Sequence, residues 1–120
     1  MLLLGTLRST SRPKRFVMEI VYNGFDNEVR VKVSEAVNGV IAPFDFSGAT
    51  SLELYIPDLD QTITSGIDWS HGGGVVSFEL GQQNIPIGNH RLRLTVFDPL
   101  HPNGQILLHE LIHDFRLRVI

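Results

Sequence analysis

The stretch "EVRVKVSEAV", Glu28–Val37, begins with a strict alternation of polar and apolar residues. A period of two places its valines on one face of an extended strand and Arg30 and Lys32 on the other. The pair Asn38-Gly39 follows directly, and this pair favours a tight hairpin turn. The sequence therefore predicts a half-buried strand whose chain turns back at Asn38.

The rest of the chain repeats this pattern of short alternating segments separated by turn residues. Further strands are expected at Phe16–Asn23, Ser51–Ile56, Gln61–Trp69 with a bend at Gly66, Val75–Leu80, Arg91–Phe97 and Phe115–Ile120. About seven strands without a long helical pattern are typical of two packed antiparallel sheets. We therefore predict an all-β protein, an immunoglobulin-like antiparallel β-sandwich over residues 16–120.

Length and composition limit the possible classes. A chain of 120 residues suits one domain with one core. It contains no cysteine, which excludes disulfides, thiolate metal ligands and cysteine nucleophiles. No apolar run approaches the roughly 20 residues needed to span a bilayer, so we expect no membrane partner.

The first fifteen residues differ in charge from the rest. Residues 1–15 carry Arg8, Arg12, Lys14 and Arg15 without an acidic residue, while residues 16–120 carry six basic and thirteen acidic residues. We expect a flexible basic N-terminal arm. The alternatives are a simply solvated segment and an arm that docks on an acidic surface of a neighbouring subunit. Because the four basic residues stand beside an acidic body, we do not expect direct nucleic-acid binding.

"HELIH", His109–His113, matches the zinc-protease pattern H-E-x-x-H. That pattern needs a helix, because residues four apart share one helical face, whereas on a strand the two histidines would lie about 13 Å apart. The apolar residues around this segment fit both the helical period of about 3.6 residues and the strand period of two. We expect either the second half of a hairpin that pairs back on Arg91–Phe97 or a brief helical turn.

The other requirements of a zinc enzyme are not met. Seven residues follow His113, and Asp114 is the sole candidate among them for a third ligand. We therefore expect no catalytic residues, no metal and no cofactor. His109 and His113 remain the least favoured candidates for a zinc hydrolase or a metal site shared between subunits.

His90 occupies a different kind of position. It follows Gly88-Asn89, where many sandwiches place a tyrosine that bonds back to the backbone at the corner between the sheets. We expect His90 to serve as this corner residue and not as a ligand.

From Phe44 onward the order of motifs resembles that of small immunoglobulin-like virion proteins of tailed bacteriophages, including the N-terminal domain type of upper baseplate proteins. The elements that carry the resemblance are Asp45–Thr50, Leu52–Ile56, Val76–Phe78, Ile85–His90, Leu94–Asp98, Pro102–Gly104 and Phe115–Val119. They cover about two thirds of the chain. The N-terminal segment and "VSEAVNGVIAP" lie outside the resemblance or fit it loosely.

The resemblance implies a non-enzymatic structural component of a virion, in the tail, baseplate or neck, synthesised in the host cytoplasm. Its partners would be other virion subunits, and a homo-oligomer is expected. A capsid cement or decoration protein is the near alternative. A carbohydrate-binding or adhesion module belongs to another class, and it would need aromatic side chains exposed on one face.

Overall fold

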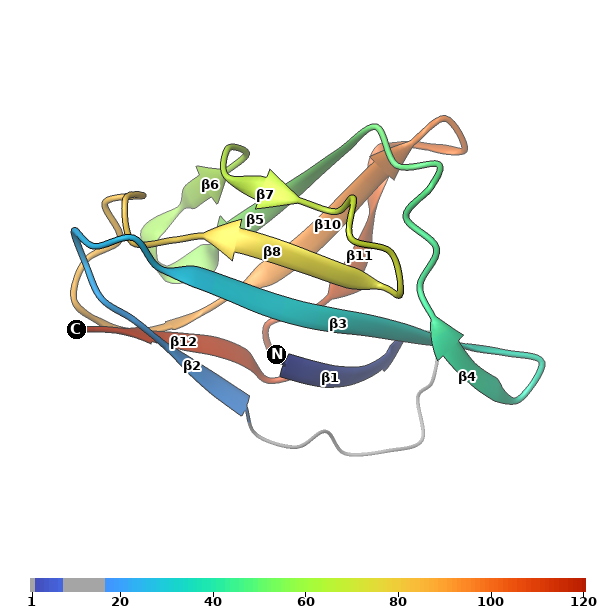
Figure 1. Ribbon diagram of the computed structural model, residues 1–120, viewed down its shortest axis with the longest axis horizontal. Helices are drawn as coiled ribbons and strands as arrows, with labels where there is room; N and C mark the ends of the chain where they lie inside the picture. The colour runs from blue at the N-terminus through green and yellow to red at the C-terminus, as the bar shows by residue number, and fades with distance from the viewer. Residues whose placement is uncertain (1, 8–16) are drawn as a thin grey trace.

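A computed structural model describes residues 2–7 and 17–120 (Figure 1). The strands are β1 (Leu2–Leu7), β2 (Val17–Val21), β3 (Glu28–Val37), β4 (Val40–Pro43), β5 (Ser51–Ile56), β6 (Gln61–Ile63), β7 (Ile67–Asp68), β8 (Val75–Glu79), β9 (Gly88–Arg91), β10 (Arg93–Asp98), β11 (His101–Leu108) and β12 (Phe115–Val119). A short 3₁₀ turn, η1, spans Pro57–Leu59. Among these residues no helix has the length and hydrophobicity needed to cross a membrane.

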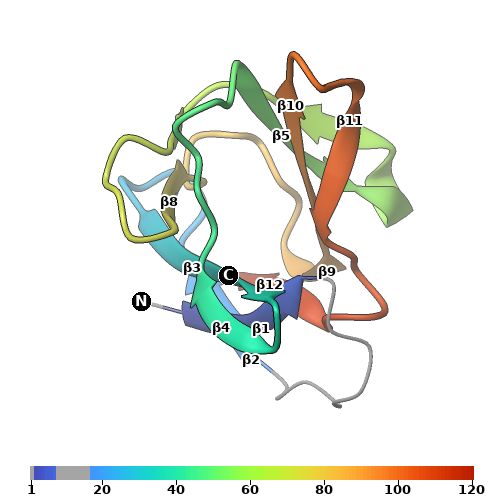
Figure 2. The ribbon, with the colours of Figure 1, turned by 90° about the vertical axis from the view of Figure 1, so that its right-hand side faces the viewer.

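The strands form the two layers of a sandwich. One sheet has the order β1-β3-β8-β7, with β4 paired to β3. The other has the order β11-β10-β5-β6, and β2-β12-β9 forms a third set. Figure 2 views the molecule from its end, with β3 and β8 on one side and β5, β10 and β11 on the other.

The strand order is that of an immunoglobulin-like sandwich. In chain order, β3, β7 and β8 correspond to strands B, D and E, while β5, β6, β10 and β11 correspond to C, C′, F and G. β9 and β12 continue F and G, since β9 pairs with β12 as β10 pairs with β11. The predicted fold class is confirmed. The twelve strands of the described residues exceed the predicted seven for three reasons: F and G are each interrupted, the predicted strand Gln61–Trp69 is divided into β6 and β7, and β1 and β4 are additional.

Two pairings depart from an antiparallel arrangement. β2 runs parallel to β12, and β1 runs parallel to β3, with Leu2 opposite Val31 and Leu7 opposite Glu35. Residues 2–7 of the predicted arm therefore belong to a sheet, a pairing between distant segments that a local pattern does not reveal. Arg8, Arg12, Lys14 and Arg15 lie outside the described residues.

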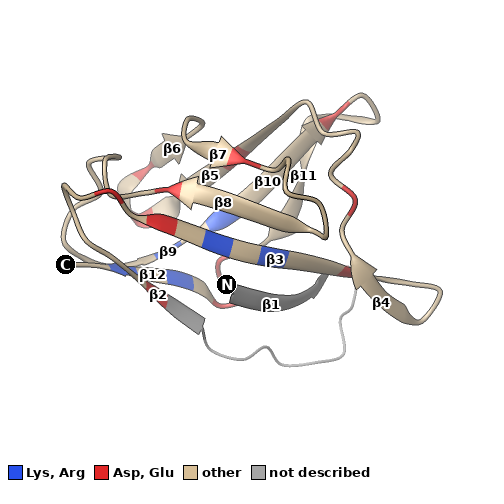
Figure 3. Cartoon of the chain, viewed as in Figure 1, with Lys and Arg blue, Asp and Glu red and all other residues tan. Residues whose placement is uncertain are grey.

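The core fills the space between the layers. Its fully buried side chains come from facing strands of both sheets, as the period-two pattern predicts. Those with no measurable exposure are Val21, Val31, Val33, Leu54, Ile56, Val76, Leu94, Leu107 and Leu108. The outward positions of β3 carry the charges that Figure 3 shows along this strand.

The β3–β4 hairpin projects from one end of the sandwich (Figure 1). Asn38 and Gly39 form its two-residue turn at φ of 51° and 79°, which confirms the predicted turn. Positive φ at both positions matches the twist of the flanking strands.

The turn between β10 and β11 is shorter than the sequence predicts. "DPLHPNG", Asp98–Gly104, is dense in turn residues, but the chain reverses at Pro99-Leu100, and Pro102-Asn103-Gly104 lie within β11. The Oδ1 atom of Asp98 accepts a hydrogen bond from the backbone N–H of His101 at 2.7 Å and closes the turn. Gly104, at φ of 91°, lies where the register of the pairing between β10 and β11 shifts.

Candidate functional site

The HELIH segment interrupts strand G. β11 ends at Leu108 and β12 begins at Phe115, while on the neighbouring strand Leu92 alone separates β9 from β10. The backbone N–H of Leu92 donates to the carbonyl of Phe115 at 2.9 Å, so the pairing resumes at once. Residues 109–114 therefore form a large bulge that leaves the sheet between two paired stretches.

Within the bulge the two histidines bond to backbone groups. The N–H of His113 donates to the carbonyl of His109 at 3.0 Å, which closes a single helical turn. Nδ1 of His113 accepts the N–H of His109 at 2.8 Å, and Nδ1 of His109 accepts the N–H of Leu111 at 3.1 Å. The brief helical turn is thus the correct alternative over residues 109–113, and the hairpin strand ends at Leu108.

Glu110 is tied to the neighbouring strand. Arg93 donates from Nε to Oε1 at 2.8 Å and from Nη2 to Oε2 at 2.7 Å. The Glu110 side chain is 10% exposed, and the hydrogen bond from Arg93 lowers the pKa of this carboxyl. Both oxygens are engaged, so Glu110 is held as an anion that anchors the bulge and is not poised as a general base.

Asp114 fastens the other end of the bulge. Arg91 and Arg116 are directly opposite each other on β9 and β12, an arrangement in which like charges repel. The carboxylate of Asp114 lies between them, 3.2 Å from Nη1 of Arg91 and 3.0 Å from Nη2 of Arg116. The negative charge of Asp114 offsets the repulsion between Arg91 and Arg116 at the point where the bulge ends.

The sequence predicts two histidines at the surface or at its boundary, which holds for His109 and is wrong for His113. His113 is 8% exposed, because the bulge folds its ring inward, while His109 is partly buried. Among residues 2–7 and 17–120, no group of three histidine, aspartate or glutamate side chains is arranged to hold a metal ion. In this fold HELIH forms a bulge, and hydrogen bonds from Arg91 and Arg93 to Glu110 hold it against the neighbouring strand.

His90 takes the corner position predicted for it. Its ring is buried, and Nε2–H donates to the carbonyl of Pro86, four residues upstream, at 2.7 Å. Nδ1 lies 3.0 Å from Oδ2 of Asp58 in η1. The imidazole thus bonds back to the backbone as a corner tyrosine does, and it also ties this corner to η1.

Two features of the surface were missed from the sequence. The β3–β4 hairpin exposes apolar side chains, and the tripeptides Asp45-Phe46-Ser47 and Asp68-Trp69-Ser70 line one groove. The shared pattern Asp-aromatic-Ser was a visible signal, but the two tripeptides are far apart in the sequence and only the fold brings them together.

Comparisons with known proteins add little to this geometry. No protein-family model matches the chain, and no curated protein matches it. A similar solved structure is that of an endo-β-1,4-mannanase from Thermotoga petrophila, with 20% identity and a TM-score of 0.46. The match covers 88% of this chain and 18% of the mannanase chain, so this chain spans under a fifth of that protein's length.

Proposed function

We propose that this protein is a non-enzymatic structural component of a tailed-phage virion, in the tail, baseplate or neck. It acts by binding neighbouring subunits, copies of itself included. Two things support the proposal: the order of motifs from Asp45 to Val119, which resembles small virion proteins, and the immunoglobulin-like sandwich that these motifs build. The surface of the β3–β4 hairpin supplies the observation on which the proposal chiefly depends.

The hairpin tip is apolar and exposed. Val37, Val40 and Ile41 are 46%, 65% and 67% exposed, and residues 36–44 contain no charged side chain (Figure 3). Contiguous exposed apolar side chains on a soluble domain mark an interaction surface. The fixed turn at Asn38-Gly39 presents them at little cost in ordering, which favours binding.

The hairpin is suited to side-chain packing more than to strand addition. β4 is an outer strand whose pairing partner among the described residues is β3. Pro43, at its end, has no N–H to donate to a further strand. We therefore propose that a neighbouring subunit covers Val40 and Ile41 with an apolar recess.

The test is incorporation into particles. Particles purified from cells that carry the gene should contain the protein, and separated capsid and tail fractions distinguish a tail component from a capsid cement protein. The double variant Val40→Thr/Ile41→Thr keeps β-branched side chains but removes apolar surface, so it should fold normally and incorporate poorly. Ile87→Thr/Leu100→Thr is the matched control, since these residues are 74% and 87% exposed elsewhere.

The outcomes separate the two parts of the proposal. Absence of the wild-type protein from purified particles would contradict the virion role. Full incorporation of the hairpin variant would leave that role standing and would remove the hairpin as the contact.

A further inference from the structure

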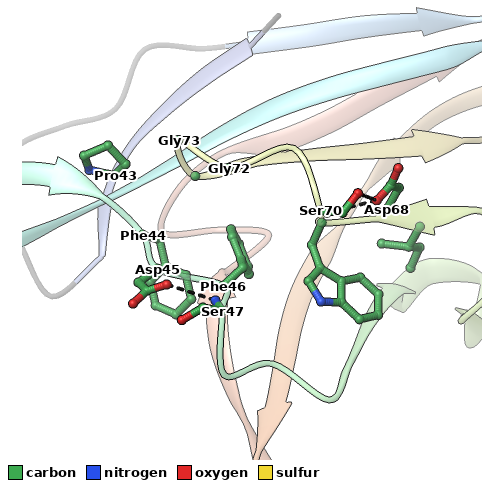
Figure 4. A pocket seen from close by; sticks show the side chains of 12 residues that line it. Pro43, Phe44, Asp45, Phe46, Ser47, Asp68, Ser70, Gly72 and Gly73 are labelled. Carbon is green, nitrogen blue, oxygen red and sulfur yellow. Dashed lines mark hydrogen bonds between the residues drawn. The ribbon is translucent and has the colours of Figure 1, made fainter.

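A groove lies between the segment that follows β4 and the segment that joins β7 to β8. Its volume is about 810 Å³, within the usual range for small-molecule sites. Two tripeptides of the same pattern line it, Asp45-Phe46-Ser47 on one side and Asp68-Trp69-Ser70 on the other. Figure 4 shows Asp45 and Ser47 on one backbone segment and Asp68 and Ser70 on the other.

The rim of the groove offers ionised carboxylates. Oδ1 of Asp45 accepts the N–H of Ser47 at 2.9 Å, and Oδ1 of Asp68 accepts the N–H and hydroxyl of Ser70 at 2.9 and 2.6 Å. These bonds lower the pKa of both carboxyls, by the backbone N–H of Ser47 for Asp45 and chiefly by the hydroxyl of Ser70 for Asp68. Oδ2 of Asp68 lies 3.6 Å from Nε2 of His71. An ionised carboxylate has about four lone-pair sites, so both groups keep acceptor capacity for a ligand.

The floor is aromatic and apolar. Phe44 and Phe46 are buried and meet edge to face, with ring centroids 4.7 Å apart. Trp69 and Ile67 are partly buried and pack against the core while they also line the groove. An aromatic and apolar floor below a polar rim suits a ligand with one apolar face and polar groups at its edge.

The third wall supplies hydrogen-bond donors. Gly72 and Gly73 line the groove, and a side chain built on either would meet nothing within 4 Å. Their backbone N–H groups make no hydrogen bond with any residue in the described part of the chain. These two N–H groups are therefore available as donors beside the groove, while the carboxylates of Asp45 and Asp68 are acceptors.

This combination selects a chemical class of ligand. A cation would be attracted by the carboxylates, but it has no lone pair with which to accept hydrogen bonds from the glycine N–H groups. An anion would be repelled by Asp45 and Asp68, since no lysine or arginine lines the groove; Arg30 and His71 offset part of the charge of Asp68 only. An uncharged ligand whose hydroxyl groups both donate and accept satisfies the two kinds of wall together.

We propose that this groove binds a saccharide, whose hydroxyls donate to Asp45 and Asp68 and accept from Gly72 and Gly73, and whose C–H face lies on Trp69. The proposal goes beyond the binding of subunits and does not rest on it. A virion component with this site would hold a glycan beside the base of the β3–β4 hairpin, because Pro43 ends β4 and also lines the groove.

Trp69 is the sole tryptophan, so intrinsic fluorescence reports on the groove directly. The probes are a panel of neutral hexoses and their disaccharides, each titrated to about 10 mM, roughly ten times a dissociation constant of about 1 mM. A lysine dipeptide and calcium chloride test the rival cationic ligands. At least one saccharide should give a saturable change in fluorescence.

The variants decide whether the response comes from this site. Asp45→Asn/Asp68→Asn should weaken saccharide binding at least about tenfold, the factor that corresponds to about 1.4 kcal/mol. Asp26→Asn, the same change at an exposed carboxylate outside the groove, should bind like wild type. No response to any saccharide, a response to the cations alone, or equal binding by the double variant would each overturn the proposal.

Discussion

Arg93 on β10 holds Glu110 of the bulge through both carboxylate oxygens, at 2.8 and 2.7 Å. The same guanidinium lies 5.4 Å from the centre of the Tyr55 ring on β5. A residue that a zinc enzyme would use to activate water thus serves here to fix a six-residue interruption of strand G onto the sheet. Four predictions follow from the contacts of the bulge, the corner and one close backbone approach.

Replacing Glu110 should destabilise the protein. In Glu110→Gln an amide NH₂ replaces one acceptor and faces the Arg93 guanidinium, so the free energy of unfolding should fall by about 1–3 kcal/mol. Glu28→Gln is the matched control, because the Glu28–Arg30 pair is 2.6 Å long but about half exposed and should change stability by under about 1 kcal/mol. Urea unfolding measures both, and equal stability of the two variants would contradict the anchoring role.

Acid should weaken the same contact. The pKa of Glu110 is lowered by the hydrogen bond from Arg93, so its contribution is complete above the unfolded carboxyl pKa, about 4.3, and is lost as pH falls through the folded value. Unfolding curves at pH 7 and at successively lower pH should show stability declining below about pH 4–5. Glu110→Gln should flatten part of that decline, and an unchanged slope would show that Glu110 is not one of the groups responsible.

The corner histidine should be needed for stability. His90→Ala removes the hydrogen bond to Pro86 and the contact with Asp58, and it leaves a cavity at a buried site, so we expect a loss of about 2–4 kcal/mol. His90→Tyr tests the corner role itself, because a tyrosine hydroxyl bonds to the backbone at this position in other sandwiches. If His90→Tyr retains no more stability than His90→Ala, the analogy with a corner tyrosine is wrong.

Gly81 should tolerate no side chain. A Cβ atom built there overlaps the carbonyl oxygen of Phe25, and the Gly24 N–H donates to the Gly81 carbonyl at 2.8 Å, so the two segments cannot separate freely. Gly81→Ala should lower stability by about 1–3 kcal/mol or more through overpacking. Gly48→Ala, at a site with nothing within 4 Å, is the control, and thermal melts that show equal losses would refute the close approach.

Much of the fold could be predicted because its signals are local. The alternation in Glu28–Val37, the Asn38-Gly39 turn and the corner position of His90 each depend on neighbouring residues, and each is found where expected. HELIH was ambiguous because helical and strand periods coincide over Leu107–Phe115. The contacts that decide it come from Arg91 and Arg93 on another strand.

The exposed hairpin tip and the groove depend on which segments the fold brings together, and a local sequence pattern does not show this. Strict alternation along β3 ends where Val33 and Ser34 are both buried, so the exposure of the hairpin tip does not follow from the period. The groove needs residues 45–47 and 68–70 side by side, and their sequence separation conceals this. The parallel pairing of Leu2–Leu7 with β3 is hidden for the same reason.

We propose that the β3–β4 hairpin contacts a neighbouring virion subunit, and the lack of cysteine in the sequence permits a direct measurement of this contact. Ile41→Cys places a single thiol on β4 of the hairpin, and Asp26→Cys places one two residues before β3 begins, at the end of β3 away from the hairpin. A short thiol-to-amine cross-linker is applied to purified particles, and mass spectrometry identifies the products. We expect a defined cross-link to one virion subunit from position 41 and little from position 26. No cross-link from position 41, or equal yields from both positions, would contradict it.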